Sequence, residues 1–145
     1  MKKHLLFALA LIAGALAFVS CEKDPADSLV GKWSFDTEKS QDGYYETVSV
    51  IFDNKGGFVF QGEQHYANPE AGQHIMLMEG TYKVNGEVIT VHYTRHGWNH
   101  NGQTEYVPNW EEYDEEMKYS ISGNKLTLTR RIGDSNPHQE VYTKQ

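Results

Sequence analysis

The stretch Leu29-Val30-Gly31-Lys32-Trp33-Ser34-Phe35 decides the fold. It is the first segment after an apolar leader in which side chains alternate as they do along a β-strand. One parity holds Gly31, Trp33 and Phe35, while the other holds Lys32 and Ser34. We predict a first strand whose Trp33 indole forms the floor of a β core, with Gly31 leaving room for that ring.

After this stretch, the sequence pattern predicts short strands separated by turns. The clearest turns are Asp53-Asn54-Lys55-Gly56-Gly57, Asn85-Gly86 and Ser122-Gly123-Asn124, in which glycine or asparagine supplies a positive φ. No helix of useful length is indicated. We therefore predict an all-β domain, a single eight-stranded up-and-down antiparallel barrel, because closure removes the edges of a small sheet.

Alternation also assigns an inward face to each expected strand. The residues predicted to line the interior are Trp33, Val50, Phe58, Phe60, Met78, Tyr82, Ile89, Val91 and Tyr93. An eight-stranded barrel has room for side chains or for one small ligand. The leading hypothesis is that these residues bind one small, largely apolar molecule, and an interior filled by side chains is the alternative.

The first twenty residues have the features of a secretory signal, with a basic start, an apolar run over residues 5–19 and Ser20 before Cys21. Cys21 is the only cysteine, so no intramolecular disulfide can form. The run Ala17-Phe18-Val19-Ser20-Cys21 resembles a lipobox, the bacterial signal for lipid attachment, and a free thiol is the alternative. We expect a signal peptide over residues 1–20, a lipidated tether over 21–28 and a barrel domain over 29–145, anchored to a bilayer without spanning it.

Charge limits the partners and the location. The chain has 20 acidic residues, and loss of the leader leaves 11 basic ones, a formal charge of −9. Such a surface repels phosphate backbones, so we expect no nucleic-acid partner. The acidic start after Cys21 resembles the surface-export signals of Bacteroidetes lipoproteins. From this resemblance and the lipobox we expect a protein of the cell envelope, anchored at the outer membrane and facing the periplasm or the surface.

Several short motifs carry a resemblance to a known family. They are Gly31-Lys32-Trp33, the glycine-rich hairpin from Phe52 to Phe58, Gly80-Thr81-Tyr82 before Asn85-Gly86, and Leu126-Thr127-Leu128-Thr129. On these the chain resembles the lipocalin and calycin group, and specifically the lipocalin-like lipoproteins of Bacteroidetes. The resemblance implies an arginine packed over the first-strand tryptophan by a cation–π contact. Arg130, in phase with Leu126 and Leu128, is the candidate for that role, with Arg131 as the alternative.

Arg95 is the candidate for a polar ligand contact. It continues the inward parity of Ile89, Val91 and Tyr93 to the end of the strand, where a barrel is open. An inward arginine at a barrel mouth can bind a ligand carboxylate through two hydrogen bonds. The alternatives are that Arg95 points to water or pairs with Glu46, the one acid that parity sends inward.

A long polar loop is expected over residues 96–114. It carries Trp98, Tyr106, Trp110 and Tyr113. Aromatic residues outside a core often mark a binding surface, either as a cover over a cavity or as platforms for sugar rings. The second functional hypothesis is therefore a surface module that binds a glycan or a protein partner here, and the alternative is that these rings plug the barrel.

Metal binding and catalysis have little support. His92, His96 and His100 are spaced by four, but His92 has the outward parity and Gly97 and Asn99 interrupt the strand, so solvated histidines are expected. The acidic run over residues 111–116 lacks the spacing of a calcium loop. Because no Gly-x-Ser-x-Gly elbow, paired carboxylate or phosphate-binding loop occurs, we expect that the protein is not an enzyme. We also expect no metal and no cofactor, and we assume a monomer.

Overall fold

The structure is a computed structural model that describes residues 25–145. The expected signal peptide, Cys21 and the start of the tether lie outside the described residues. The elements are α2 (Pro25–Leu29), β1 (Gly31–Asp36), β2 (Tyr45–Phe52), β3 (Gly57–His65), the 3-10 turn η2 (Pro69–Ala71), β4 (His74–Asn85), β5 (Val88–His100), β6 (Gln103–Tyr106), β7 (Tyr113–Ser122), β8 (Lys125–Arg130) and β9 (His138–Lys144).

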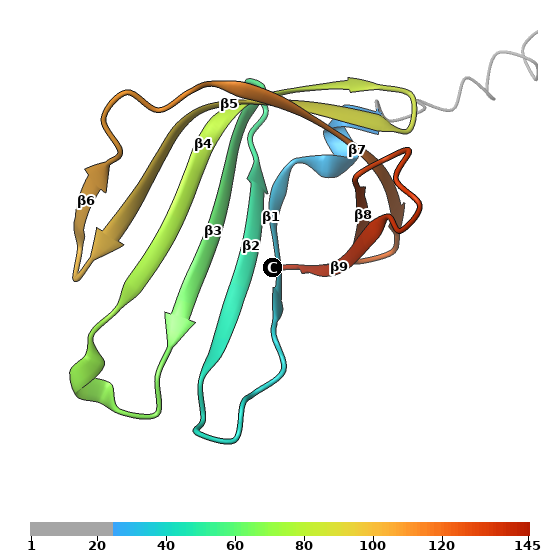
Figure 1. Ribbon diagram of the computed structural model, residues 1–145. Coiled ribbons are helices and arrows are strands. Elements are labelled where there is room, and N and C mark those ends of the chain that lie inside the picture. The colour runs from blue at the N-terminus through green and yellow to red at the C-terminus, as the bar shows by residue number, and fades with distance from the viewer. Residues whose placement is uncertain (1–24) are drawn as a thin grey trace, which may run out of the picture.

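Eight antiparallel strands close into an up-and-down barrel (Figure 1). Going round the barrel, the strands follow the order β1, β2, β3, β4, β5, β7, β8 and β9, and β9 pairs with β1. The additional strand β6 pairs with the last four residues of β5. The prediction of an eight-stranded barrel is confirmed, and β6 forms where a loop was predicted.

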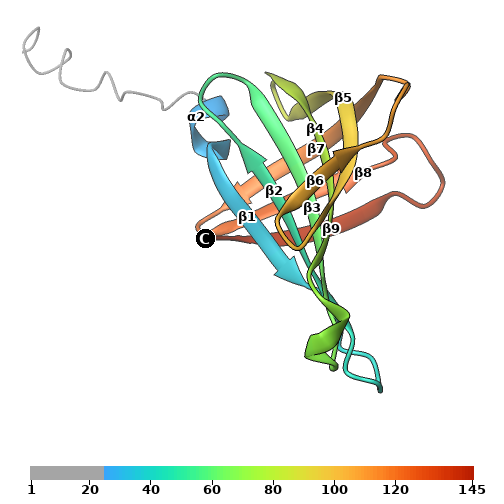
Figure 2. The same cartoon turned by 90° about the vertical axis from the view of Figure 1, so that its left-hand side faces the viewer.

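The two ends of the barrel differ. At the closed end, α2 lies beside the start of β1, and the Trp33 indole nitrogen donates a hydrogen bond of 2.7 Å to the Leu29 carbonyl oxygen. At the other end β2 to β5 continue beyond β1 and β9, and η2 and the loop over residues 37–44 project farthest (Figures 1 and 2). We call this one-sided extension the overhang; it comprises residues 37–46, 64–77 and 96–106.

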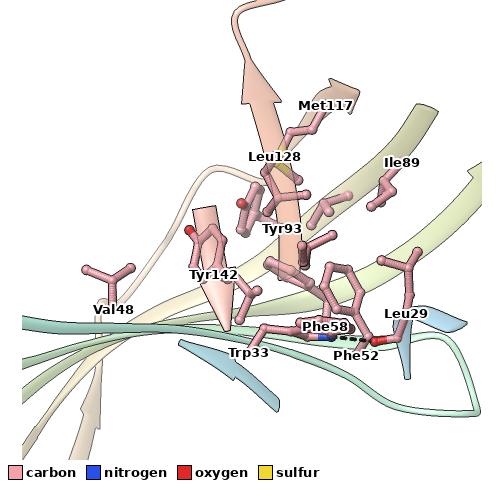
Figure 3. Packing of buried hydrophobic residues seen from close by; sticks show 13 residues of the cluster. Leu29, Trp33, Val48, Phe52, Phe58, Ile89, Tyr93, Met117, Leu128 and Tyr142 are labelled. Carbon is pink, nitrogen blue, oxygen red and sulfur yellow. Dashed lines mark hydrogen bonds between the residues drawn. The ribbon is translucent and has the colours of Figure 1, made fainter. Parts of the chain in front are cut away.

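The core fills the closed end (Figure 3). Its buried members come from seven strands and α2: Leu29, Trp33, Val48, Val50, Phe52, Phe58, Ile89, Val91, Tyr93, Met117, Leu126, Leu128 and Tyr142. Each such side chain contributes about 1.5–3 kcal/mol when it is fully buried. Trp33 and Phe58 are each 1% exposed, so they hold the fold together and offer a ligand no surface.

A β-bulge in β5 reverses its inward face. Tyr93 pairs with Gly80, but Arg95 pairs with Glu79, so Thr94 is an extra residue in the ladder. One inserted residue moves every later side chain to the opposite face. Arg95 therefore points outward, where Nη2 lies 2.7 Å from Glu79 and the side chain is 59% exposed. The prediction that Arg95 lies inside the mouth is wrong, and so is the pairing with Glu46, whereas the alternative that Arg95 points to water agrees with its exposed side chain.

The cation over Trp33 is not the one the family resemblance implied. The Lys144 ammonium lies 5.0 Å from the centre of the indole, whereas the Arg130 guanidinium lies 5.6 Å from the Phe60 ring. The reason is register, because Lys144 is the direct neighbour of Trp33 across the β1–β9 pair. Gly31, with φ of 134°, leaves room for this lysine: a Cβ there would be 3.2 Å from the Lys144 Cε.

Candidate functional site

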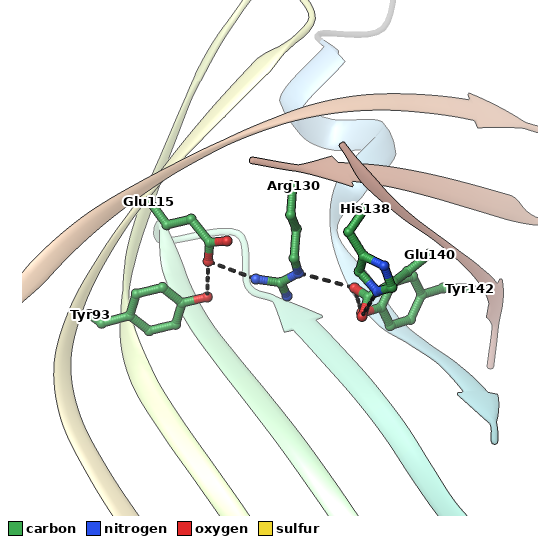
Figure 4. Close-up of polar contacts among 6 residues, drawn as sticks. All are labelled: Tyr93, Glu115, Arg130, His138, Glu140 and Tyr142. Atoms are coloured by element: carbon green, nitrogen blue, oxygen red, sulfur yellow. Dashed lines mark hydrogen bonds and ion pairs between the residues drawn. The ribbon is translucent and has the colours of Figure 1, made fainter. Parts of the chain in front are cut away.

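A row of charged side chains crosses the open end of the barrel (Figure 4). Arg130 on β8 donates from Nη1 to Glu115 Oε2 at 2.6 Å and from Nε to Glu140 Oε2 at 3.0 Å. All three point inward because they share the parity of Leu128, Met117 and Tyr142 on their strands. The Arg130 side chain is only 15% exposed, so the ion pairs are largely screened from water.

Two core tyrosines connect this row to the packed interior. The Tyr93 hydroxyl donates to Glu115 Oε2 at 3.1 Å, and the Tyr142 hydroxyl donates to Glu140 Oε2 at 2.8 Å. Burial raises the pKa of both phenols, which therefore stay protonated as donors. Burial opposes ionisation of Glu140 as well, but Arg130 and the Tyr142 hydroxyl outweigh it and lower the pKa of this carboxyl. We call the six side chains of Figure 4 the mouth cluster: Tyr93, Glu115, Arg130, His138, Glu140 and Tyr142.

One guanidinium nitrogen of Arg130 has no hydrogen-bond partner. Within residues 25–145, its Nη2 and the Trp110 indole nitrogen are the buried side-chain polar atoms without a hydrogen-bond partner. Arg130 also lines a cavity of about 410 Å³, together with Glu115, Arg131, Asn136, Pro137 and His138. Cavities of roughly 300–1,000 Å³ are typical of small-molecule sites. Nη2 itself is buried, so the cavity borders the Arg130 side chain without exposing this nitrogen.

Aromatic rings continue from the mouth cluster onto the overhang. Tyr93 lies 4.9 Å from Tyr113, Trp110 lies 6.2 Å from Tyr113 and 4.8 Å from His96, and His96 lies 5.9 Å from Trp98, measured between ring centres. We call these five rings the aromatic row. His96 and Trp98 join it because the bulge at Thr94 turns them to the face of Met78, which packs against the core.

The residues predicted to bind a ligand fall into three groups. Trp33, Phe58 and the ring of Tyr93 are core, and Tyr82 packs at the closed end, where its hydroxyl donates to the Asp53 carbonyl oxygen at 2.9 Å. Phe60 and Met78 are half-buried beside the core. Trp98 and Trp110 belong to the aromatic row. Trp98 lies in β5, and Trp110 folds back over His96.

Tyr106, the other ring of the expected loop, lies on the outside. Its hydroxyl donates to Glu79 at 3.0 Å, and the Arg95 guanidinium lies 4.8 Å from its ring centre. The 96–114 segment is therefore divided between strands and faces, and only part of it reaches the mouth.

Sequence reasoning missed Glu115, His138 and Glu140. Glu115 is two residues before Met117, so alternation could have placed it inside, but the acidic run around it was interpreted as a solvated face. Glu46 is thus not the one inward acid; its carboxylate accepts from the Tyr44 hydroxyl on the overhang. His138 and Glu140 stand on the strand with the weakest apolar pattern.

The histidines separate in space. His92 points outward, and its two ring nitrogens lie 2.7 Å from Asp114 and 3.3 Å from Glu112. Across the described part of the chain, no three His, Cys, Asp or Glu side chains are grouped to hold a metal ion. Within those same residues, the helices are too short and too polar to cross a bilayer.

Comparison with known proteins gives no match: no family model, curated protein or solved structure is similar to this chain. The functional argument therefore depends on the geometry of the mouth cluster and the aromatic row.

Proposed function

We propose that this protein is a lipid-anchored, lipocalin-like barrel that binds a small molecule at its open end. The observation that carries the proposal is a cavity of about 410 Å³ at the mouth, lined by Arg130 and Glu115 of the mouth cluster. A ligand acceptor that reached the unpartnered Nη2 would recover the roughly 1–3 kcal/mol that a buried donor without a partner costs. The closed barrel with Gly31-Lys32-Trp33 on its first strand supports the lipocalin-like assignment.

The surroundings of Arg130 define the ligand chemistry. Glu115 and Glu140 already surround the guanidinium with two negative charges, so a third carboxylate would be repelled. A neutral acceptor such as a carbonyl, ether or hydroxyl oxygen suits Nη2 better. The Phe60 ring, 5.6 Å from the guanidinium, and the Tyr93 ring, whose hydroxyl bonds to Glu115, provide apolar surface beside Arg130. The ligand is therefore amphipathic, with an apolar part and at least one neutral oxygen. The protein binds this ligand and does not catalyse a reaction on it.

The position of α2 orients the barrel on the membrane. Three residues separate Cys21 from Pro25, the first residue of α2. Four extended residues span at most about 14 Å, so an acylated Cys21 holds the closed end close to the bilayer. The mouth, at the opposite end, then faces away from the lipid (Figure 1). This arrangement suits an envelope protein that takes its ligand from the periplasm or from outside the cell.

Native mass spectrometry tests this function on the intact protein extracted from cells in a mild detergent. We expect a bound mass of a few hundred daltons on the wild type. Asn136→Trp, which fills the cavity without removing a member of the mouth cluster, should abolish it, whereas Lys83→Trp on the outer face should not. A bare protein mass in the wild type, or an adduct that survives Asn136→Trp, would contradict the proposal.

A second candidate function is glycan binding through the aromatic row. The observation that favours it is that Trp98 and Tyr113 are partly exposed on the open side, in line with the half-buried Trp110. Base or sugar rings stack on such side chains because their faces are large and rigid. A glycan array probed with wild type and Trp98→Ala separates the candidates, since binding that depends on Trp98 and persists in Asn136→Trp supports the glycan function.

A further inference from the structure

Two histidines meet at the tip of the overhang. His74 on β4 is the direct cross-strand neighbour of His100 on β5, and their Nδ1 atoms are 2.6 Å apart. Both side chains are accessible to solvent, and the ring centres are 4.7 Å apart at an interplanar angle of 76°. The spacing by four residues that linked His92, His96 and His100 did not reveal this pair, because the contact joins positions 26 residues apart.

The hydrogen bonds determine which nitrogens carry lone pairs. His74 Nε2 is 3.0 Å from the Ala71 carbonyl oxygen, so Nε2 donates and the lone pair of the neutral ring is on Nδ1. His100 Nδ1 must then donate to His74 Nδ1. If the neutral His100 ring moves its proton to Nε2, both Nδ1 lone pairs face one point. A metal-bound histidine commonly donates its other nitrogen to a backbone carbonyl, as His74 does here.

The backbone around the pair is held in place. The Asn101 side-chain oxygen accepts from the Gln73 N–H at 3.1 Å, and the Asn101 N–H donates to the Gln73 carbonyl oxygen at 3.2 Å. These bonds join the β3–β4 loop to the β5–β6 turn beside His74 and His100. Gly72 permits the close approach, since a Cβ there would be 3.0 Å from the Asn101 side-chain oxygen. Positioning of this kind lowers the entropic cost of assembling a site.

The geometry points to a two-imidazole site for a divalent transition-metal ion, made by His74 and His100. Imidazole nitrogen suits Cu²⁺, Ni²⁺ and Zn²⁺, and for one ligand set Cu²⁺ binds most tightly. With bonds of about 2.0–2.1 Å, the two Nδ1 atoms separate to about 2.9 Å for cis ligands of a tetragonal Cu²⁺ and to about 3.3 Å for a tetrahedral Zn²⁺. That movement is below 1 Å for two exposed side chains. Water or a bound molecule completes the coordination, because the chain supplies two ligands.

The test is a Cu²⁺ titration of the intact protein in mild detergent, followed by tryptophan fluorescence and electron paramagnetic resonance. The Trp98 ring lies parallel to His100 with 6.5 Å between centres, so bound Cu²⁺ should quench its emission. We expect one ion per chain with hyperfine structure from two nitrogens, displaced by Zn²⁺ only at higher concentration. His74→Gln and His100→Gln should each weaken binding at least about tenfold, and Trp98→Phe should remove the quenching but keep the two-nitrogen spectrum.

Matched controls exclude other ligands. His92→Gln and His65→Gln remove histidines that point outward and should leave the affinity unchanged. Every variant retains Cys21, so any metal bound there is common to all samples. Equal affinity in the wild type and in both His74→Gln and His100→Gln overturns the inference, as does a spectrum without two-nitrogen coupling. Because His74 and His100 are not in the mouth cluster, these outcomes are independent of the proposed ligand site.

Discussion

At the scale of single residues, two arginines of this chain pair with glutamates in very different surroundings. Arg130 is 15% exposed and bridges Glu115 and Glu140, whereas Arg95 is 59% exposed and meets Glu79 on the outer surface. Removing one partner from a buried pair leaves an uncompensated charge, while exposed pairs contribute little. The same type of contact therefore has different consequences at the two positions.

Arg130→Gln should lower the free energy of unfolding by about 3–5 kcal/mol, because Glu115 and Glu140 lose their common cation. Arg95→Gln should change it by less than about 1 kcal/mol. Urea denaturation of both variants and the wild type at neutral pH measures the difference. Equal losses in the two variants would show that Arg130 is not held in a buried network.

His92 provides a pH-dependent prediction. Its hydrogen bond to Asp114, with Glu112 on the other ring nitrogen, raises the pKa of His92 above the ordinary value of 6.5. A raised pKa in the folded state means that the contribution to stability is complete below pH 6.5 and is lost as pH rises through the folded value. A pH titration followed by NMR should place the His92 pKa above 6.5, and Asp114→Asn should bring it down. An unchanged His92 titration in Asp114→Asn would contradict this account.

The mouth cluster was partly predictable at this scale. Parity correctly put Arg130 in phase with the buried Leu126 and Leu128. Its partners were missed because an acidic residue on an inward position is normally unfavourable, and only the buried cation makes Glu115 and Glu140 acceptable. Which cation faces which carboxylate depends on pairing between strands distant in sequence, which alternation does not report.

At the scale of elements, the bulge in β5 determines what the mouth contains. It needs Gly80 on the facing strand, because a Cβ at this position would lie 2.0 Å from the His92 carbonyl oxygen. After the bulge, β5 turns His96, Trp98 and His100 inward and Arg95 outward. A strand of unbroken alternation would have placed Arg95 inside the barrel and His96 and Trp98 outside it.

Gly80→Ala should destabilise the protein by about 1–3 kcal/mol or more, since the backbone must move to admit the methyl group. Gly62→Ala is the control on the adjacent strand, because its Cβ would meet only the Met76 methyl, at 3.8 Å. That variant should be neutral or more stable by roughly 0.5–1 kcal/mol, as alanine restricts the unfolded chain. Thermal and urea unfolding of the pair test this, and a tolerated alanine at position 80 would contradict the close backbone approach.

Alternation predicted the inward faces correctly as far as Tyr93 and failed beyond it. A single extra residue is invisible in hydropathy, since Arg95, Gly97 and Asn99 read as the end of a strand. The isolated glycine at position 80, inside a strand pattern, was the available signal for a bulge. Similarly, β6 is exposed along its length, so no apolar periodicity marked it.

At the scale of the whole molecule, closure follows from the pattern that every strand shares. Each of the eight has one apolar face, and hairpin turns join neighbours, so a cylinder buries all these faces together. The closure of eight strands into a barrel could therefore be predicted from the sequence. The overhang could not, because strand length beyond the core depends on hydrogen bonding among polar residues at the tip, such as those of Gln73 and Asn101.

The proposed anchor predicts the orientation of the barrel on a membrane. Spin labels at Asn54→Cys, in the hairpin at the closed end, and at Asn136→Cys, at the mouth, report distance from the lipid. With the protein in vesicles that contain a nickel-chelating lipid, relaxation at position 54 should exceed that at position 136, because the proposed anchor lies only four positions before Pro25, where α2 begins at the closed end. Equal relaxation, or the reverse order, would contradict the proposed orientation.

The joint between β1 and β9 is the shortest in the cylinder. Two register pairs, Trp33 with Lys144 and Ser34 with Thr143, connect these strands, and the Gln145 N–H adds a bond of 3.0 Å to the Lys32 carbonyl oxygen. By contrast, six register pairs connect β1 to β2 and six connect β8 to β9. Amide protons in the β1–β9 pair should therefore exchange with solvent sooner than those in the β1–β2 and β8–β9 pairs. Transient separation of β1 from β9 would also expose the buried Trp33 indole to water.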